Sequence, residues 1–86
     1  MTKEKILTYI KNIKLIDIIN YCFKEGIKID NTDLHKIYTS IKDNSEDIID
    51  NPLKVINNLQ VSNDIHNKLL ELYNKYKFLL DKIKEK

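Results

Sequence analysis

Apolar residues along this chain recur mostly every three or four positions, which is the spacing of one face of an α-helix. The longest such stripe lies in the last quarter of the chain and consists of Ile65, Leu69, Leu72, Tyr76, Leu79 and Ile83. A helix over residues 64–84 would be about 31 Å long, roughly the diameter of a whole small domain. Its first half has further apolar residues beside the stripe and is expected to pack in the core. Its second half is expected to extend beyond the core.

Two apolar stripes near the N-terminus predict two helices with a break between them. Residues 3–13 follow Thr2, a suitable N-cap, and carry the stripe Ile6, Ile10 and Ile13. Residues 15–25 carry a second stripe, which consists of Leu15, Ile18, Ile19, Cys22 and Phe23. In one straight helix the two stripes would lie on opposite sides, so we predict a break or sharp bend near residues 12–14. The alternative is one continuous helix packed between two partners.

Turn and cap residues place the boundaries of the next helix. Gly26 is expected to end the preceding helix in a left-handed backbone conformation. Asp30, with Asp33 three residues later, is expected to cap a helix that ends near Lys42. The inner face of this helix is predicted to consist of Leu34, Ile37, Tyr38 and Ile41.

The segment between residues 43 and 64 is predicted to contain a loop and one short helix. Residues 43–51 are interpreted as a loop that Ile48 and Ile49 hold against the core. Pro52 suits the first position of a short helix, whose inward residues are predicted to be Leu53, Ile56 and Leu59. Ser62 or Asn63 is expected to cap the long last helix. The sequence therefore predicts an all-α fold, with residues 1–86 in a single domain, a compact bundle of about five helices with a long C-terminal helix.

The chain has 86 residues and a net charge of +2, a size that supports one small core. Residues 1–28 and residues 65–86 each hold six Lys and three acidic residues, whereas residues 29–64 hold three Lys and seven acidic residues. The basic ends would form one face if the first and last helices were neighbours. A single Cys cannot form an internal disulfide, and no apolar run has the length of a signal peptide or a membrane span. These features predict a soluble, cytoplasmic protein without a membrane contact.

Sequence patterns for catalysis and metal binding are missing. The chain has one Gly, which excludes a glycine-rich phosphate loop, and no Ser-His-Asp pattern is recognisable. His35 and His66 lack a second ligand at metal-binding spacing, and we expect one to be exposed and the other half-buried. Cys22 lies within an apolar stripe and is expected to be a small core residue. We therefore predict no enzymatic activity, no cofactor, no metal and no small-molecule ligand.

The acidic segment after residue 42 resembles the start of a calcium-binding loop. Asp43, Ser45 and Asp47 match its first three ligand positions. The loop then requires a Gly for its turn and a bidentate Glu at its end, and this chain has Ile48 and Lys54 there. A solvated acidic loop is the better interpretation.

Residues 20–42 are expected to form a helix, a Gly-containing turn and a second helix, as in DNA-binding helix-turn-helix motifs. The second helix would present Asp30 and Asp33 where contacts to DNA are needed, and carboxylates repel phosphates. A plain helical hairpin is therefore the better interpretation, and nucleic-acid binding is not expected. The alternative is weak, non-specific binding by lysines of the terminal helices, namely Lys3, Lys5, Lys11, Lys75, Lys82 and Lys84.

Three stretches of the sequence are similar to a known family. They are Tyr21 followed by "EGIKID", then "HKIYTSIK", and "KLLELYNKYK" near the C-terminal end. From about residue 13 to residue 78, the chain resembles the uncharacterised YqfT-like family of short proteins from low-GC Gram-positive bacteria. It departs from the family at Lys14-Leu15, where the family tends to have Thr-Pro, and at Asp43-Asn44, where the family has Gly. The resemblance implies a compact helical fold and brings no activity or site residues.

Phe78 is the residue that least fits packing within the chain. On a helical wheel it lies among Glu71, Lys75 and Lys82, away from the apolar stripe. Together with the separate stripe of the first helix, a large apolar side chain in this place indicates an interface. The candidate interface residues are Ile6, Ile10, Ile13, Tyr76, Phe78, Leu79 and Ile83. We therefore expect a small protein–protein interaction module, whose partner is another protein or a second copy in a homodimer through the first and last helices.

Overall fold

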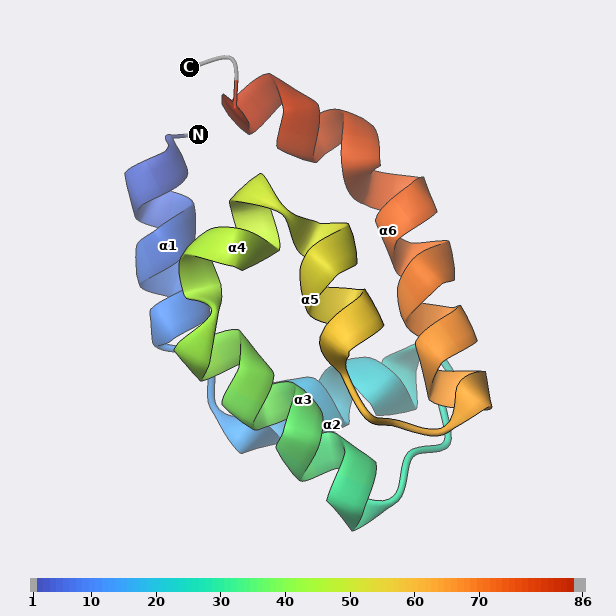
Figure 1. Ribbon diagram of the computed structural model, residues 1–86. Coiled ribbons are helices and arrows are strands. Elements are labelled where there is room, and N and C mark those ends of the chain that lie inside the picture. The colour runs from blue at the N-terminus through green and yellow to red at the C-terminus, as the bar shows by residue number, and fades with distance from the viewer. Residues whose placement is uncertain (1, 85–86) are drawn as a thin grey trace.

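A computed structural model describes residues 2–84, apart from the side chains at positions 80, 83 and 84, and within that range the chain is helical without strands. The helices are α1 (Lys3–Lys11), α2 (Leu15–Lys24), α3 (Asn31–Asp43), α4 (Ser45–Asp50), α5 (Pro52–Asn58) and α6 (Asn63–Lys84). They pack into a compact all-α bundle in which the long α6 runs along one side (Figure 1). The predicted fold class is therefore confirmed.

The predicted break between the first two helices is also confirmed. Thr2 caps α1, because its side-chain oxygen accepts a hydrogen bond from the Lys5 backbone N–H at 3.3 Å. The backbone is extended at Lys14, whose N–H donates to the Asp17 carboxylate at 2.9 Å. This bond starts α2 in a new direction, so that each of the two helices can turn an apolar side toward the core.

The C-terminal end of α2 forms a Schellman motif around Gly26. The Ile27 N–H donates to the Cys22 carbonyl at 2.8 Å, and the Gly26 N–H donates to the Phe23 carbonyl at 3.2 Å. Gly26 has a φ of +68°, the left-handed conformation that its position predicts. The turn directs the chain back toward α3, which Asp30 caps by accepting from the Asp33 N–H at 2.8 Å.

Replacing Gly26 with alanine is expected to lower the free energy of unfolding by about 1 kcal/mol, because an L-residue is strained at this φ. An added Cβ would meet no atom within 4 Å, so the effect comes from the backbone alone. Gly26→Asn serves as the control and should cost less, because Asn tolerates this conformation better. Urea denaturation followed by circular dichroism measures both changes, and equal costs for the two variants would contradict the assignment.

The segment predicted to be a loop between α3 and α5 is instead a helix, α4. Single residues, Asn44 and Asn51, separate α4 from its two neighbours in sequence. It packs against α1, α3, α5 and α6, and Figure 1 shows it between α1 and α5. Ile49 is fully buried, so the expectation that this segment is held to the core is correct although its conformation is not. Pro52 begins α5, as predicted.

The core is small and draws on almost every helix. Its buried apolar residues are Ile10, Cys22, Leu34, Ile37, Ile49 and Ile65. Three predictions of inward residues are wrong: Ile19 and Phe23 lie on the outer side of α2, and Leu53 on α5 is exposed. The Asp33 carboxylate, which is also buried, accepts a hydrogen bond from the Ser62 N–H at 3.1 Å and so joins α3 to the start of α6.

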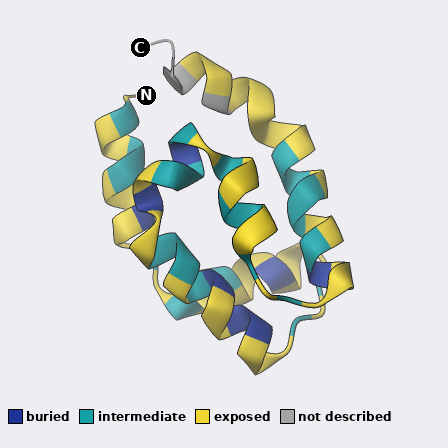
Figure 2. Ribbon diagram, viewed as in Figure 1, coloured by how far each residue is buried: buried dark blue, intermediate teal, exposed yellow. Residues whose placement is uncertain are grey.

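The long α6 is buried only along its first half. Ser62 caps it by accepting from the Ile65 N–H at 3.4 Å, as predicted. Burial then ends at Tyr73, and every described side chain from Asn74 to Lys82 is exposed, as the upper part of α6 in Figure 2 shows. The prediction that the second half extends beyond the core is confirmed.

Candidate functional site

Three exposed large apolar side chains lie on the outer side of α2, and one of them, Phe23, is the most exposed large apolar side chain among the described residues. Phe23 is 88% exposed, Ile16 is 53% exposed and Ile19 is 40% exposed. Their spacing of three and four residues places them in one line along the helix. We call these three residues the α2 outer face.

This face exists because α2 is apolar on more than one side. Leu15, Ile18 and Cys22 turn toward the core and are half-buried or buried. Ile16, Ile19 and Phe23 are rotated away from them and have no covering element among the described residues. The α2 outer face was not predicted, because Ile19 and Phe23 share the helical period of the inward residues Leu15, Ile18 and Cys22. The signal that could have found it is Ile16, an apolar residue outside the predicted inward stripe.

A second exposed apolar group lies on the distal half of α6. Tyr76 is 40% exposed, Phe78 is 56% exposed and Leu79 is 44% exposed. Lys75 Nζ lies 5.5 Å from the centre of the Tyr76 ring, so one basic side chain covers part of that ring. The structure thus presents three of the predicted interface residues to solvent. The fourth on this helix, Ile83, has a side chain outside the described residues.

The three predicted interface residues of the first helix have a different environment. Ile10 is buried inside the chain, and Ile6 and Ile13 are half-buried. Helix α1 packs on α3 and α4, whereas α6 packs on α4 and α5. Figure 1 shows α1 and α6 flanking the α4–α5 pair, with the start of α1 and the end of α6 toward the same end of the bundle. The expectation is therefore corrected for Ile10, which is buried and not available to a partner, whereas an interface through the first and last helices stays a prediction.

An apolar groove of about 390 Å³ lies beneath the inner side of α2, between α2, α3 and α6. Its walls include Ile18, Cys22, Ile41 and Leu69. Burial raises the pKa of the Cys22 thiol above its ordinary value of 9.0. The thiol is therefore protonated at neutral pH, which suits the predicted core role and makes it a poor nucleophile.

Tyr21 lies on α2 at the same groove, whose α6 side consists of residues from the first half of that helix. Its pKa is raised above 10.0, first by burial and then by the neighbouring Glu25 carboxylate and Tyr76 phenol.

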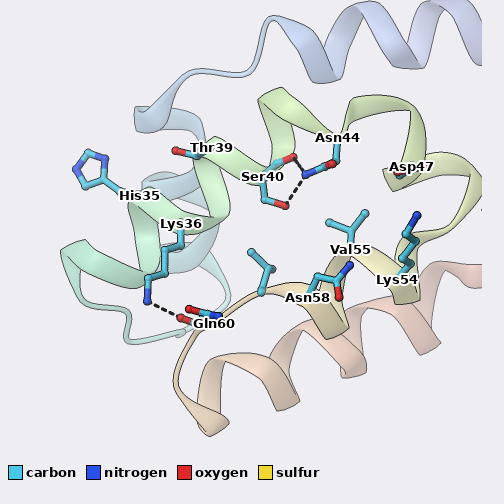
Figure 3. Close-up of a pocket in the computed structure, with 11 residues that line it drawn as sticks. His35, Lys36, Thr39, Ser40, Asn44, Asp47, Lys54, Val55, Asn58 and Gln60 are labelled. Atoms are coloured by element: carbon cyan, nitrogen blue, oxygen red, sulfur yellow. Dashed lines mark hydrogen bonds between the residues drawn. The ribbon is translucent and has the colours of Figure 1, made fainter.

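A polar cleft of about 560 Å³ lies between α3 and α5, with α4 at one end (Figure 3). Lys36 Nζ donates to the Gln60 carbonyl at 2.6 Å, and the Asn44 amide donates to the Ser40 carbonyl at 3.2 Å. Lys54 is accompanied by Asp47 in the same cleft. The cleft therefore holds charges of both signs and an ammonium group already bound to backbone, which is a weak basis for recognising an anion.

The residues considered for metal binding do not come together. No group of three or more His, Cys, Asp or Glu within the described part of the chain could hold a metal ion. Ser45 is buried within α4 and Asp47 is half-buried on it, so the calcium-loop positions are helical. His35 is exposed and His66 is half-buried, as predicted.

The lysines predicted to form a basic surface are divided between separate places. Lys3 forms an ion pair with Asp50 at 3.0 Å, which ties α1 to α4. Lys5 and Lys11 are exposed on α1, whereas Lys75 and Lys82 are exposed on α6. The side chain of Lys84 lies outside the described residues. The described lysines of this set therefore lie on two separate helices, and Lys3 is already paired with an acidic residue of its own chain.

Comparisons with known proteins found no matching family model, no similar curated protein and no similar solved structure. The resemblance to the YqfT-like family therefore stays a prediction. None of the helices within residues 2–84 combines the length and the apolar character needed to cross a membrane.

Proposed function

We propose that this protein is a helical module that binds another protein chain through the α2 outer face and the distal half of α6. The observation that carries the proposal is Phe23, which is 88% exposed and stands in line with Ile16 and Ile19. An apolar stripe along the outside of one helix is a recurring means of docking to a protein partner. Single exposed apolar residues are ordinary, but three in line on one helix are a candidate contact surface.

The exposed side chains could supply a useful share of the binding free energy. Removing one large apolar side chain from water contributes about 1.5–3 kcal/mol. Three such residues on α2 would have to offset the cost of associating two molecules and ordering their side chains. Tyr76 and Leu79 on α6 offer additional apolar area. A partner that covers both surfaces would therefore bind more tightly than one that covers α2 alone.

Site-specific photo-crosslinking in cells that produce the protein tests this function. A photoreactive phenylalanine analogue replaces Phe23 in one variant and Phe78 in another, and both analogues keep the aromatic shape of the original side chain. The control replaces Asn57, which is exposed on α5, a helix that carries neither of the two apolar groups. We expect one discrete adduct from each of positions 23 and 78, none from position 57, and mass spectrometry identifies the crosslinked chain.

Replacing an apolar residue of the surface with a charged one tests whether the crosslinks depend on that surface. Leu79→Asp should remove the adduct at position 78, because the charge would be buried without a partner in the complex. Circular dichroism shows whether this variant keeps its helices, since Leu79 is already exposed. Labelling at positions 23 and 78 that does not exceed labelling at position 57 would refute the proposed function.

A second candidate function is weak, non-specific nucleic-acid binding by the distal half of α6. The observation in its favour is that Lys75, Lys77 and Lys82 are exposed there, with Asp81 as the acidic neighbour. Such binding would weaken steeply with added salt, because it depends on releasing counterions from phosphates. Fluorescence anisotropy with mixed-sequence single- and double-stranded DNA measures this binding at low salt. The absence of binding under these conditions would eliminate this candidate.

A further inference from the structure

We propose that the apolar groove between α2, α3 and α6 binds one uncharged aliphatic molecule. The groove has a volume of about 390 Å³, which is within the range of about 300–1,000 Å³ that is usual for small-molecule sites. It lies on the inner side of α2, so the inference does not depend on the proposed function, which uses the outer side. The sequence predicted no small-molecule ligand, because the groove depends on how three helices are placed.

The groove is an elongated space beside α6. In the described part of the chain, α2 packs mainly against α3, whereas α6 packs against α4 and α5. Ile18 on α2, Ile41 on α3 and Leu69 on α6 line the space that remains, and all three stay half-buried. On α6 the wall extends from Ile65 to Leu72, about 10 Å along the helix axis. A space of this length suits a chain-like molecule.

The walls of the groove are aliphatic, and its polar groups lie at the mouth. Ile13, Ile27 and Ile29 also line the groove and are half-buried. The lining side chains with charged or hydroxyl groups are all exposed, namely Tyr9, Asp17, Tyr21 and Lys68. A polar group deep in such a groove would lose its bonds to water without replacement. An aliphatic chain loses no such bonds, and it would remove the apolar walls from water.

The charges at the mouth favour a ligand without a charge of its own. The Asp17 carboxylate accepts a backbone N–H at 2.9 Å, and the Lys68 ammonium lies 3.5 Å from the Glu71 carboxylate. A charged head of either sign would meet one attractive and one repulsive group, and exposed ion pairs contribute little. The phenols of Tyr9 and Tyr21 can donate to a neutral hydroxyl or accept from it.

Titration with n-decanol, followed by NMR of isotope-labelled isoleucine methyl groups, tests the inference. We expect shifts for Ile18 and Ile41, which line the groove. Ile16 and Ile19, exposed on the other side of α2, should not shift. The dissociation constant is expected to be on the order of 100 µM. n-Octanol has two fewer methylene groups and should bind about tenfold more weakly. Decanoate and decylammonium should bind at least about fivefold more weakly than n-decanol.

A matched pair of variants makes the same change on two sides of α2. Ile18→Phe adds atoms to the groove and should weaken n-decanol binding by at least about fivefold. Ile16→Phe changes the outer side and should leave binding within about twofold of the original chain. Circular dichroism shows whether each variant keeps its helices. Leu69→Phe on the opposite wall gives a second test of groove filling, with the same expected loss.

The acyl tails of a membrane lipid offer the same chemistry as a free aliphatic molecule. Co-sedimentation with phosphatidylcholine vesicles distinguishes the two sources. We expect the protein to stay in the supernatant, because the charged groups at the mouth would have to leave water to reach the tails. Retention on the vesicles that n-decanol abolishes would assign the groove to lipid tails and overturn the inference.

Four results of the titrations would also overturn the inference. They are no methyl shift up to the solubility limit of n-decanol, equal shifts on the two sides of α2, charged homologues that bind as tightly as n-decanol, and groove-filling variants that bind it as tightly as the original chain. The crosslinks from positions 23 and 78 test the proposed function separately, so either conclusion can fail without the other.

Discussion

Replacing Ile49 with alanine is expected to lower the free energy of unfolding by about 3–4 kcal/mol, a large part of the total stability of a chain this small. Ile49 has no exposed surface, and it is the largest described side chain with complete burial. It belongs to α4, which packs against four other helices. The removed atoms would leave a cavity that these surrounding helices cannot all close at once. Urea denaturation followed by circular dichroism at 222 nm measures the loss.

Two matched variants establish that the position of Ile49, and not the removal of an apolar group as such, causes this loss. Ile49→Val removes one methylene and should cost about 1 kcal/mol. Leu53→Ala removes a similar group from α5, where the side chain is 41% exposed, and should cost less than about 1 kcal/mol. If Leu53→Ala were as costly as Ile49→Ala, the central position of α4 in the core would be wrong.

The importance of α4 was the least predictable part of the fold. Its six residues, SEDIID, contain only two adjacent apolar residues, so no helical period can be recognised in them. A segment this short has little helical stability of its own. It becomes a helix because packing against its neighbours stabilises it, and those neighbours are distant in sequence. The burial of Ile49 could still be expected, since an apolar pair in an acidic segment gains most by leaving water.

Helix boundaries were largely predictable because they depend on neighbouring residues. The cap at Thr2, the cap at Asp30 and the left-handed Gly26 each involve hydrogen bonds within five residues along the chain. Pro52 at the start of α5 needs only its own fixed φ. Such local interactions depend only on residues that are close along the chain, so they can be predicted without knowledge of the tertiary fold.

The candidate site was predictable only in part. The exposure of the second half of α6 was predictable from the length of the helix, since a 22-residue helix is longer than the core of so small a bundle. The α2 outer face could not be assigned in the same way, because α2 is apolar on adjacent sides and the period alone does not choose between them. The direction in which α2 leaves the break after α1 decides that Cys22 is buried and Phe23 is exposed. That direction is a property of the tertiary fold.

Replacing Asp33 with alanine is expected to lower the free energy of unfolding by about 2 kcal/mol, through the loss of one buried carboxylate that serves two helices. Asp33 lies in the first turn of α3, and its Oδ2 atom accepts from the N–H of Ser62, the cap residue of α6. Its negative charge therefore lies near the positive ends of two helix dipoles. Alanine would remove both the hydrogen bond and the charge.

Two controls separate these contributions, again by urea denaturation. Asp33→Asn keeps an oxygen that can accept from Ser62 and removes the charge, so it should cost about 1 kcal/mol, roughly half of the alanine effect. Asp30→Ala removes only the cap of α3 and should also cost about 1 kcal/mol. Because both Asp33 variants remove the charge, the difference between them measures the hydrogen bond. An asparagine variant as stable as the original chain would show that the dipole interaction contributes nothing. An alanine variant of unchanged stability would show that the α3–α6 bond does not hold the two helices together.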